Sequence, residues 1–258
     1  MKILVINPNI SESVSALIRA EAERAASPGT EIIVRTAAFG VEYIETRVEA
    51  LLAGNAVAQI IAEEDGFVDG VVVAAFGDPG MPALKELVDI PVVGITGAAI
   101  HTAALQGSRF SIVAISQRIQ AWYRECVERN GMGSSLASIR SLQDSLGSIG
   151  SVQEDFRDKL LQLAHDVVEK DGADVVILAG APLAGLAREI GGQIPVPVVD
   201  GISAGVKQCE LLISLNGGTH RKGSFARPPH KTNAGLSADI TRTLDRGAKT
   251  SEESSVAP

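Results

Sequence analysis

Three side chains that could move a proton lie in or beside loops that follow predicted strands: Glu45, Asp78 and His101. A carboxylate can act as a general acid or base, and histidine titrates near neutral pH. Each residue also has a structural interpretation. Glu45 could be a solvated carboxylate at a helix start, Asp78 a helix cap before a proline, and His101 a packing residue within a helix.

A second group of residues could bind a substrate. Asn7 could orient an amide or carboxyl group, although Asn-Pro-Asn is also common in turns. Ser116 could donate to a bound oxygen or cap the helix that follows. Small residues in these loops leave backbone N–H groups free to stabilise an anionic oxygen such as an enolate. The predicted substrate-binding residues are Asn7, Ala75, Phe76, Gly77, Ser116, Gly180, Ala181 and Pro182.

These loops belong to a duplicated pattern. Residues 70–80 and 174–185 each read as a buried strand, a small-residue turn and a helix, and each is followed by another strand. Regular alternation of strands and helices predicts an α/β protein with two pseudo-symmetric, Rossmann-like, three-layer halves and mainly parallel sheets. The halves cover residues 1–107 and 108–216, and residues 217–258 form an extended arm whose end, 249–258, is expected to be disordered. Ligands in such folds bind at the carboxyl ends of the strands, here between the halves.

Composition excludes several classes of protein. The chain has 258 residues, 45% hydrophobic and 3% aromatic content, and a net charge of −8, which argues against nucleic-acid binding. No apolar run is long enough to span a membrane, and a strand at the N-terminus leaves no room for a signal peptide, so we expect a cytoplasmic protein. The four histidines and two cysteines lack metal-ligand spacing, and neither a P-loop nor a Gly-x-Gly-x-x-Gly turn is present. We therefore expect no metal and no cofactor.

Three short motifs carry a family resemblance. Ile-Asn-Pro-Asn at 6–9, Phe-Gly-Asp-Pro-Gly at 76–80 and Ile-His-Thr-Ala at 100–103 resemble the hydantoin/allantoin racemases of the aspartate/glutamate racemase superfamily. The resemblance covers about residues 1–216. It implies two pseudo-symmetric halves, a small-molecule substrate and a homo-oligomer.

The same resemblance implies two catalytic cysteines, one directly before Phe76 and one directly before Ala181. This chain has Ala75 and Gly180 at those positions, so both expected proton carriers are missing. Cys126 and Cys209 lie in predicted helices and are expected to be packed structural residues. Ala75 could reflect an engineered Cys→Ala change, but residues 179–183 differ throughout from a cysteine loop, which favours a natural subfamily.

The sequence thus predicts an isomerase-like enzyme of the racemase superfamily that works without cysteine. Its substrate would be a small polar carbonyl compound, such as a hydantoin, a ureide or an amino-acid-like acid, held in an oxyanion- or enolate-stabilising site between two lobes. Two alternatives stay open: a lyase, decarboxylase or hydrolase on the same scaffold, and a catalytically inactive ligand-binding protein.

Overall fold

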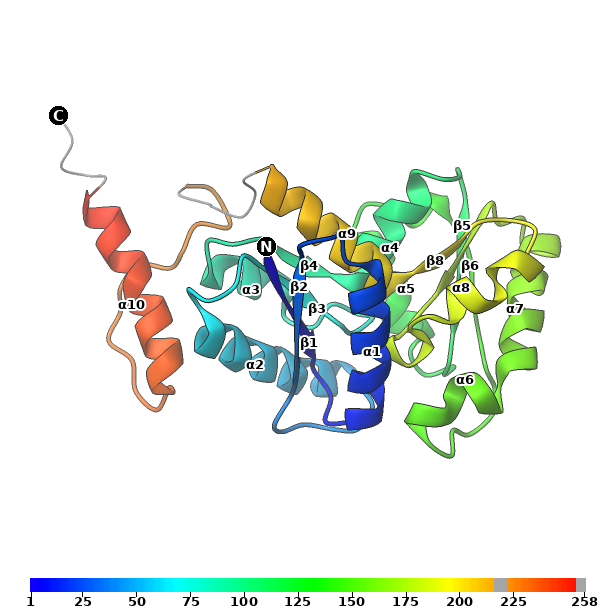
Figure 1. The fold of residues 1–258 in the computed structure, drawn as a ribbon, viewed down its shortest axis with the longest axis horizontal. Helices are drawn as coiled ribbons and strands as arrows, with labels where there is room; N and C mark the ends of the chain where they lie inside the picture. The colour runs from blue at the N-terminus through cyan, green and yellow to red at the C-terminus, as the bar shows by residue number, and fades with distance from the viewer. Residues whose placement is uncertain (216–221, 254–258) are drawn as a thin grey trace.

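Two sheets with helices on their faces form the body of the protein (Figure 1). The structure is a computed structural model that describes residues 1–215 and 222–253, without the side chains of 247–253. The strands are β1 (Lys2–Asn7), β2 (Glu31–Thr36), β3 (Gly70–Val73), β4 (Val92–Gly94), β5 (Phe110–Ala114), β6 (Leu136–Ser141), β7 (Val175–Leu178) and β8 (Val198–Asp200). The α-helices are α1 (Glu12–Ala25), α2 (Arg47–Glu64), α3 (Met81–Leu87), α4 (Ile95–Ala104), α5 (Gln120–Arg129), α6 (Val152–Asp155), α7 (Arg157–Glu169), α8 (Leu186–Ile190), α9 (Gly201–Ser214) and α10 (Ala238–Glu253).

The two sheets repeat one topology. The strand order is β2-β1-β3-β4 in the first and β6-β5-β7-β8 in the second, and every pair is parallel. The central strands β3 and β7 are buried at every residue, as expected for Val- and Ile-rich strands covered on both faces. The predicted α/β fold with two pseudo-symmetric halves is confirmed.

The halves exchange their last helices. Helix α4 ends the first half of the sequence, yet it contacts β5, β7 and β8 of the second sheet. Helix α9 ends the second half, and it contacts β3 and β4 of the first sheet. The two helices pack on each other at two glycines, because a Cβ at Gly201 or Gly205 would lie 3.3 or 3.2 Å from Ile95.

One apolar cluster consequently runs through both lobes. It contains Ile3 and Val72 from the first sheet and Ile112 and Ile177 from the second. The lobes therefore share a core.

Buried carboxylates tie α9 to the first lobe. Glu210 accepts hydrogen bonds from the Ser27 N–H at 2.7 Å, the Ser27 hydroxyl at 2.8 Å and the Thr30 hydroxyl at 2.7 Å. Lys207 donates to the same carboxylate at 3.0 Å. Burial opposes the charged form of Glu210, but these donors outweigh it and lower its pKa to about 2.

The C-terminal arm returns to the first lobe. Ser237 caps α10, and α10 packs on α2, where Arg246 pairs with Asp65 at 2.9 Å. Residues 249–253, the start of the tail that we expected to be disordered, continue this helix. Residues 216–221 and 254–258, which include the rest of that predicted tail, lie outside the described residues.

Candidate active site

A polar cavity of about 730 Å³ lies between the lobes. It is lined from the first half by the loops after β1 and β2 and from the second half by the loops after β5 and β6. These loops all leave the carboxyl ends of parallel strands, where ligands bind in open α/β folds. The lining residues are Ser11, Ser13, Glu42, Tyr43, Glu45, Ser116, Arg118, Asp144, Ser145, Leu146, Gly147, Ser148 and Ile149. We call this space the interlobe cavity.

Glu45 lies in the interlobe cavity, on a loop that is firmly anchored. Thr46 caps α2, and the Glu49 carboxylate accepts the backbone N–H groups of Glu45 and Thr46, both at 2.8 Å. This capping box fixes the backbone from which Glu45 projects. Of the three predicted proton-transfer residues, Glu45 is the one that lines this cavity.

Tyr43, which the sequence did not single out, lines the cavity two residues earlier. Its ring packs on the apolar cluster of the second lobe, and its hydroxyl oxygen is buried without a hydrogen-bond partner among the described residues. Burial and the nearby carboxylates of Glu45 and Glu49 raise the pKa of this hydroxyl, which keeps it protonated. A residue that lines the cavity thus carries a buried hydroxyl without an acceptor among the described residues.

Ser116 and Arg118 face Glu45 from the other lobe. The Ser116 hydroxyl accepts the Arg118 N–H at 3.3 Å, so it organises the turn after β5 while lining the cavity. The structure thus brings together two of the predicted site residues, Glu45 and Ser116.

Asn7 has a different surrounding from the one the sequence suggested. Its side chain is fully buried, and its amide nitrogen lies 2.9 Å from Asn9 Oδ1, 3.1 Å from the Ser11 carbonyl and 2.9 Å from Ser15 Oγ. Its Oδ1 accepts the Asn9 N–H at 3.2 Å. These bonds occupy the amide, which holds the β1–α1 turn that carries Ser11 and Ser13.

Asp78 is likewise occupied by backbone donors. Its carboxylate accepts the N–H of Thr96 at 2.8 Å and of Gly97 at 2.9 Å, at the start of α4. Burial raises its pKa, against these two N–H groups, which favour the charged form. Asp78 has a φ of +47°, a left-handed conformation that aspartate tolerates better than most residues. The geometry is that of a remote helix cap that joins the β3–α3 loop to α4.

Aromatic side chains share a buried cluster with Ala75, the first position at which the sequence resemblance implies a cysteine. The Phe76 ring lies 4.7 Å from the Tyr123 ring, and Ala75, Phe76, Trp122 and Tyr123 belong to one buried cluster. Gly77 has a φ of +120° and contacts Trp122 so closely that any Cβ there would collide with the indole. Ala75 and Phe76 therefore lie in the packed floor and do not line the interlobe cavity.

The loop after β7, which contains Gly180, has a left-handed residue followed by a tight turn. Gly180 has a φ of +114°, and Ala181–Leu183 form a 3₁₀ turn whose Ala181 and Pro182 are buried. Gln153 donates to the carbonyls of Pro182 and Ala184, both at 2.9 Å. Gly180, Ala181 and Pro182 are not among the residues that line the interlobe cavity.

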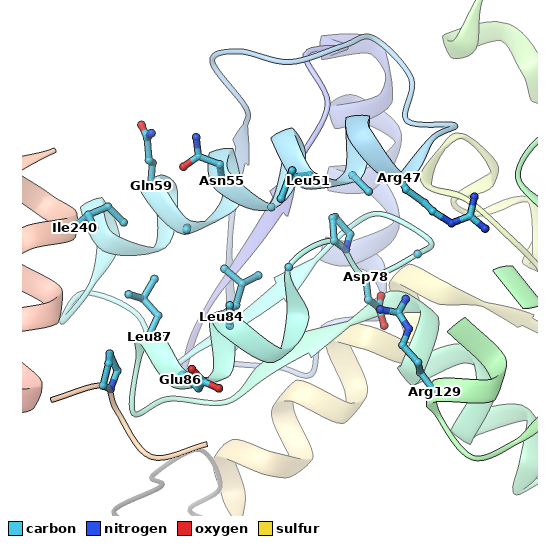
Figure 2. A pocket seen from close by; sticks show the side chains of 18 of the residues that line it. Arg47, Leu51, Asn55, Gln59, Asp78, Leu84, Glu86, Leu87, Arg129 and Ile240 are labelled. Atoms are coloured by element: carbon cyan, nitrogen blue, oxygen red, sulfur yellow. The ribbon is translucent and has the colours of Figure 1, made fainter. Parts of the chain in front are cut away.

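His101 is exposed on α4 and does not line the interlobe cavity. It also does not line a second pocket, which we call the outer groove. That groove, of about 1270 Å³, runs between α2 and α3 and ends against α10 (Figure 2). Gly77 and Asp78, in the loop between β3 and α3, also line this groove. In Figure 2, Asp78 and Arg129 lie at one end and Ile240 at the other. The structure therefore places Asp78 at the outer groove, Glu45 at the interlobe cavity and His101 at neither.

Both cysteines are buried away from the interlobe cavity. Burial raises the pKa of Cys126 to about 11, although Arg129, which donates to its sulfur at 3.0 Å, opposes this. Burial and the adjacent Glu210 raise the pKa of Cys209 to about 12. Neither thiol is set up to form a reactive thiolate near neutral pH.

Two absences hold for the residues that the structure describes. None of their helices combines the length and apolar character that crossing a bilayer requires. Their His, Cys, Asp and Glu side chains form no group of three that could hold a metal ion.

Known proteins resemble the chain over nearly its whole length. The model of the family described as Asp/Glu/hydantoin racemase matches residues 3–209. A hydantoin racemase of Paenarthrobacter aurescens is 34% identical over 233 residues, which cover 90% of this chain and 99% of the relative. Among solved structures, an allantoin racemase from Klebsiella pneumoniae is 33% identical with a TM-score of 0.88, covering 93% of this chain and 98% of its own. An allantoin racemase from Pseudomonas fluorescens is also 33% identical, with a TM-score of 0.86. The match covers 91% of this chain and 100% of that structure's chain. The chain belongs to the Asp/Glu/hydantoin racemase family.

Proposed function

We propose that this protein is a cysteine-independent enzyme of the racemase family that removes a proton from the α-carbon of a small polar carbonyl compound. Hydantoins and ureides are the preferred substrate class, because the relatives named above are hydantoin and allantoin racemases. The observation that carries the proposal is the placement of Glu45 in a polar cavity between the lobes. The absence of cysteine at Ala75 and Gly180, where the sequence resemblance implies the catalytic cysteines, supports it.

Glu45 is the proposed base. Its carboxylate takes the proton from Cα, the electron pair of the C–H bond moves into the carbonyl group, and an enolate forms. The same carboxyl then returns a proton to Cα. A positioned general base contributes about 10²- to 10⁴-fold to such a step.

A single base has a characteristic isotopic signature. Because Glu45 approaches one face of Cα, hydrogen should exchange with solvent on that face more often than the centre inverts. In deuterated water, proton NMR of 5-substituted hydantoins and allantoin should show loss of the Cα hydrogen signal. This loss should come before the loss of optical rotation that polarimetry measures. A two-base enzyme would instead incorporate one deuterium with each inversion.

Three variants test the residue assignments. Glu45→Gln should slow exchange by about 10²-fold or more, whereas Glu42→Gln, which removes a carboxylate from the same loop and cavity, should retain most of it. A Cys126→Ala/Cys209→Ala double variant should exchange at the parent rate. Loss of exchange in the double variant would make the reaction thiol-dependent and would reject the proposal. Ligand binding without exchange would identify a binding protein instead.

A further inference from the structure

The orphaned hydroxyl of Tyr43 has a consequence for the chemistry of the interlobe cavity. A buried hydroxyl without a partner is uncommon, because each such group costs the full free energy of its desolvation. Tyr43 also lies where the aromatic floor meets the cavity. Tyr43 and Glu45 are close enough to Tyr123 to raise its pKa further, after burial, and the Tyr123 ring packs on Phe76, the neighbour of Ala75.

We propose that Tyr43 is the oxyanion donor of the site: its hydroxyl hydrogen-bonds the carbonyl oxygen of the substrate and stabilises the enolate. The inference rests on the proposed function, because it names the group that receives the charge when Glu45 removes the Cα proton. The proton of that step goes to Glu45 and the electron pair goes to the substrate oxygen. Tyr43 keeps its own proton and shares it in a hydrogen bond.

Three features fit this role better than a packing role. First, the ring is held by the second lobe while the backbone belongs to the first, so the hydroxyl is positioned by both. Secondly, the raised pKa of the Tyr43 hydroxyl keeps it protonated, so it remains a hydrogen-bond donor. Thirdly, fixed donors aimed at a developing oxyanion act most strongly when they are shielded from water, as this hydroxyl is.

Two ring compounds separate an oxyanion donor from an ordinary contact. Hydantoin is a neutral ring of the substrate class, and urazole is a planar ring of the same size that loses a proton near neutral pH and places negative charge on its carbonyl oxygens. Calorimetric titration of the full chain at pH 8 measures both. A hydrogen bond to a charged acceptor is worth more than one to a neutral acceptor, so Tyr43→Phe should weaken urazole binding by roughly 10- to 100-fold. Hydantoin binding should weaken by less than about 10-fold.

Stability supplies a second readout that a structural role would not share. Since the hydroxyl has no partner in the protein, Tyr43→Phe should leave the melting temperature of the free protein unchanged or raise it. Tyr123→Phe is the matched control, because it removes a hydroxyl from the adjacent ring, which does not line the cavity, and urazole affinity should be unchanged.

Three results would each overturn the proposal. The parent and Tyr43→Phe could bind urazole with equal affinity, or the parent could fail to bind urazole at millimolar concentration. The third result is a clearly lower melting temperature of Tyr43→Phe. Urazole binding that Tyr43→Phe weakens, in a protein that exchanges no Cα hydrogen with any substrate, would keep the donor site and reject the proposed reaction. The two proposals can therefore fail separately.

Discussion

Asp78 provides a sharp test of whether a site carboxylate supports structure or transfers protons. Both of its oxygens accept backbone N–H groups at the start of α4. Asp78→Ala would leave these two N–H groups, of buried Thr96 and half-buried Gly97, without their acceptor. Each buried orphan donor costs about 1–3 kcal/mol, so a loss of about 3 kcal/mol in the free energy of unfolding is expected. Asp78→Asn keeps one acceptor oxygen and should cost about half as much.

Thermal and urea denaturation measure this loss. For a chain of this size, about 3 kcal/mol corresponds to a fall of about 6–12 °C in melting temperature. Asp174→Asn is a matched control, because the Asp174 carboxylate also accepts two backbone N–H groups, of Ser108 and Arg109, at 3.0 and 2.9 Å. Asp174 is exposed, so water can replace the lost acceptor, and its variant should lose less than about 1 kcal/mol.

The functional assay completes the test. If Asp78 is a cap, Cα exchange in Asp78→Asn should fall little at temperatures well below its transition. An Asp78→Asn protein that is as stable as the parent but no longer exchanges Cα hydrogen would refute the reasoning. That result would return Asp78 to the role of proton carrier.

Two further predictions concern acid stability and the backbone at Gly180. Because the pKa of Glu210 is lowered from 4.5 to about 2, its stabilisation is fully present above pH 4.5 and is lost as the pH falls through about 2. Urea denaturation between pH 6 and pH 2 should show that this group accounts for a loss of at most about 3 kcal/mol in the free energy of unfolding. In Glu210→Gln this part of the pH dependence should be absent. A pH dependence equal to that of the parent would contradict the prediction. At Gly180 the φ of +114° makes any side chain strained, so Gly180→Cys should cost about 1–3 kcal/mol in thermal denaturation. Gly191→Cys, at an ordinary φ of −56° with open space around it, should be nearly neutral, and equal losses in both variants would contradict the strain argument.

Most of the fold could be predicted because its signals are local. Runs of Val and Ile give strands that must be buried on both faces, and their repetition along the chain gives two similar halves. The exchange of α4 and α9 could not be predicted in this way. The pattern of a helix shows that one face is buried but does not show which sheet buries it.

The site was predictable at the level of loops and less so at the level of side chains. The rule that ligands meet the carboxyl ends of strands selected the loops of Glu45 and Ser116, and both residues line the interlobe cavity. It could not show that backbone N–H groups far along the chain occupy Asp78, or that Tyr123 covers Phe76, because both depend on tertiary contacts. Tyr43 carries no motif, and its orphaned hydroxyl is visible only once its surroundings are known.

The crossed positions of α4 and α9 limit how this protein can open and how it can be divided. Since each sheet is covered by a helix from the other half of the sequence, a cut near residue 107 would strip both sheets of apolar cover. Fragments 1–107 and 108–253 should each be unstable alone and should recover structure when mixed. The lobes are interlocked, so a hinge between two independent bodies is disfavoured as the way in which a ligand enters the cavity.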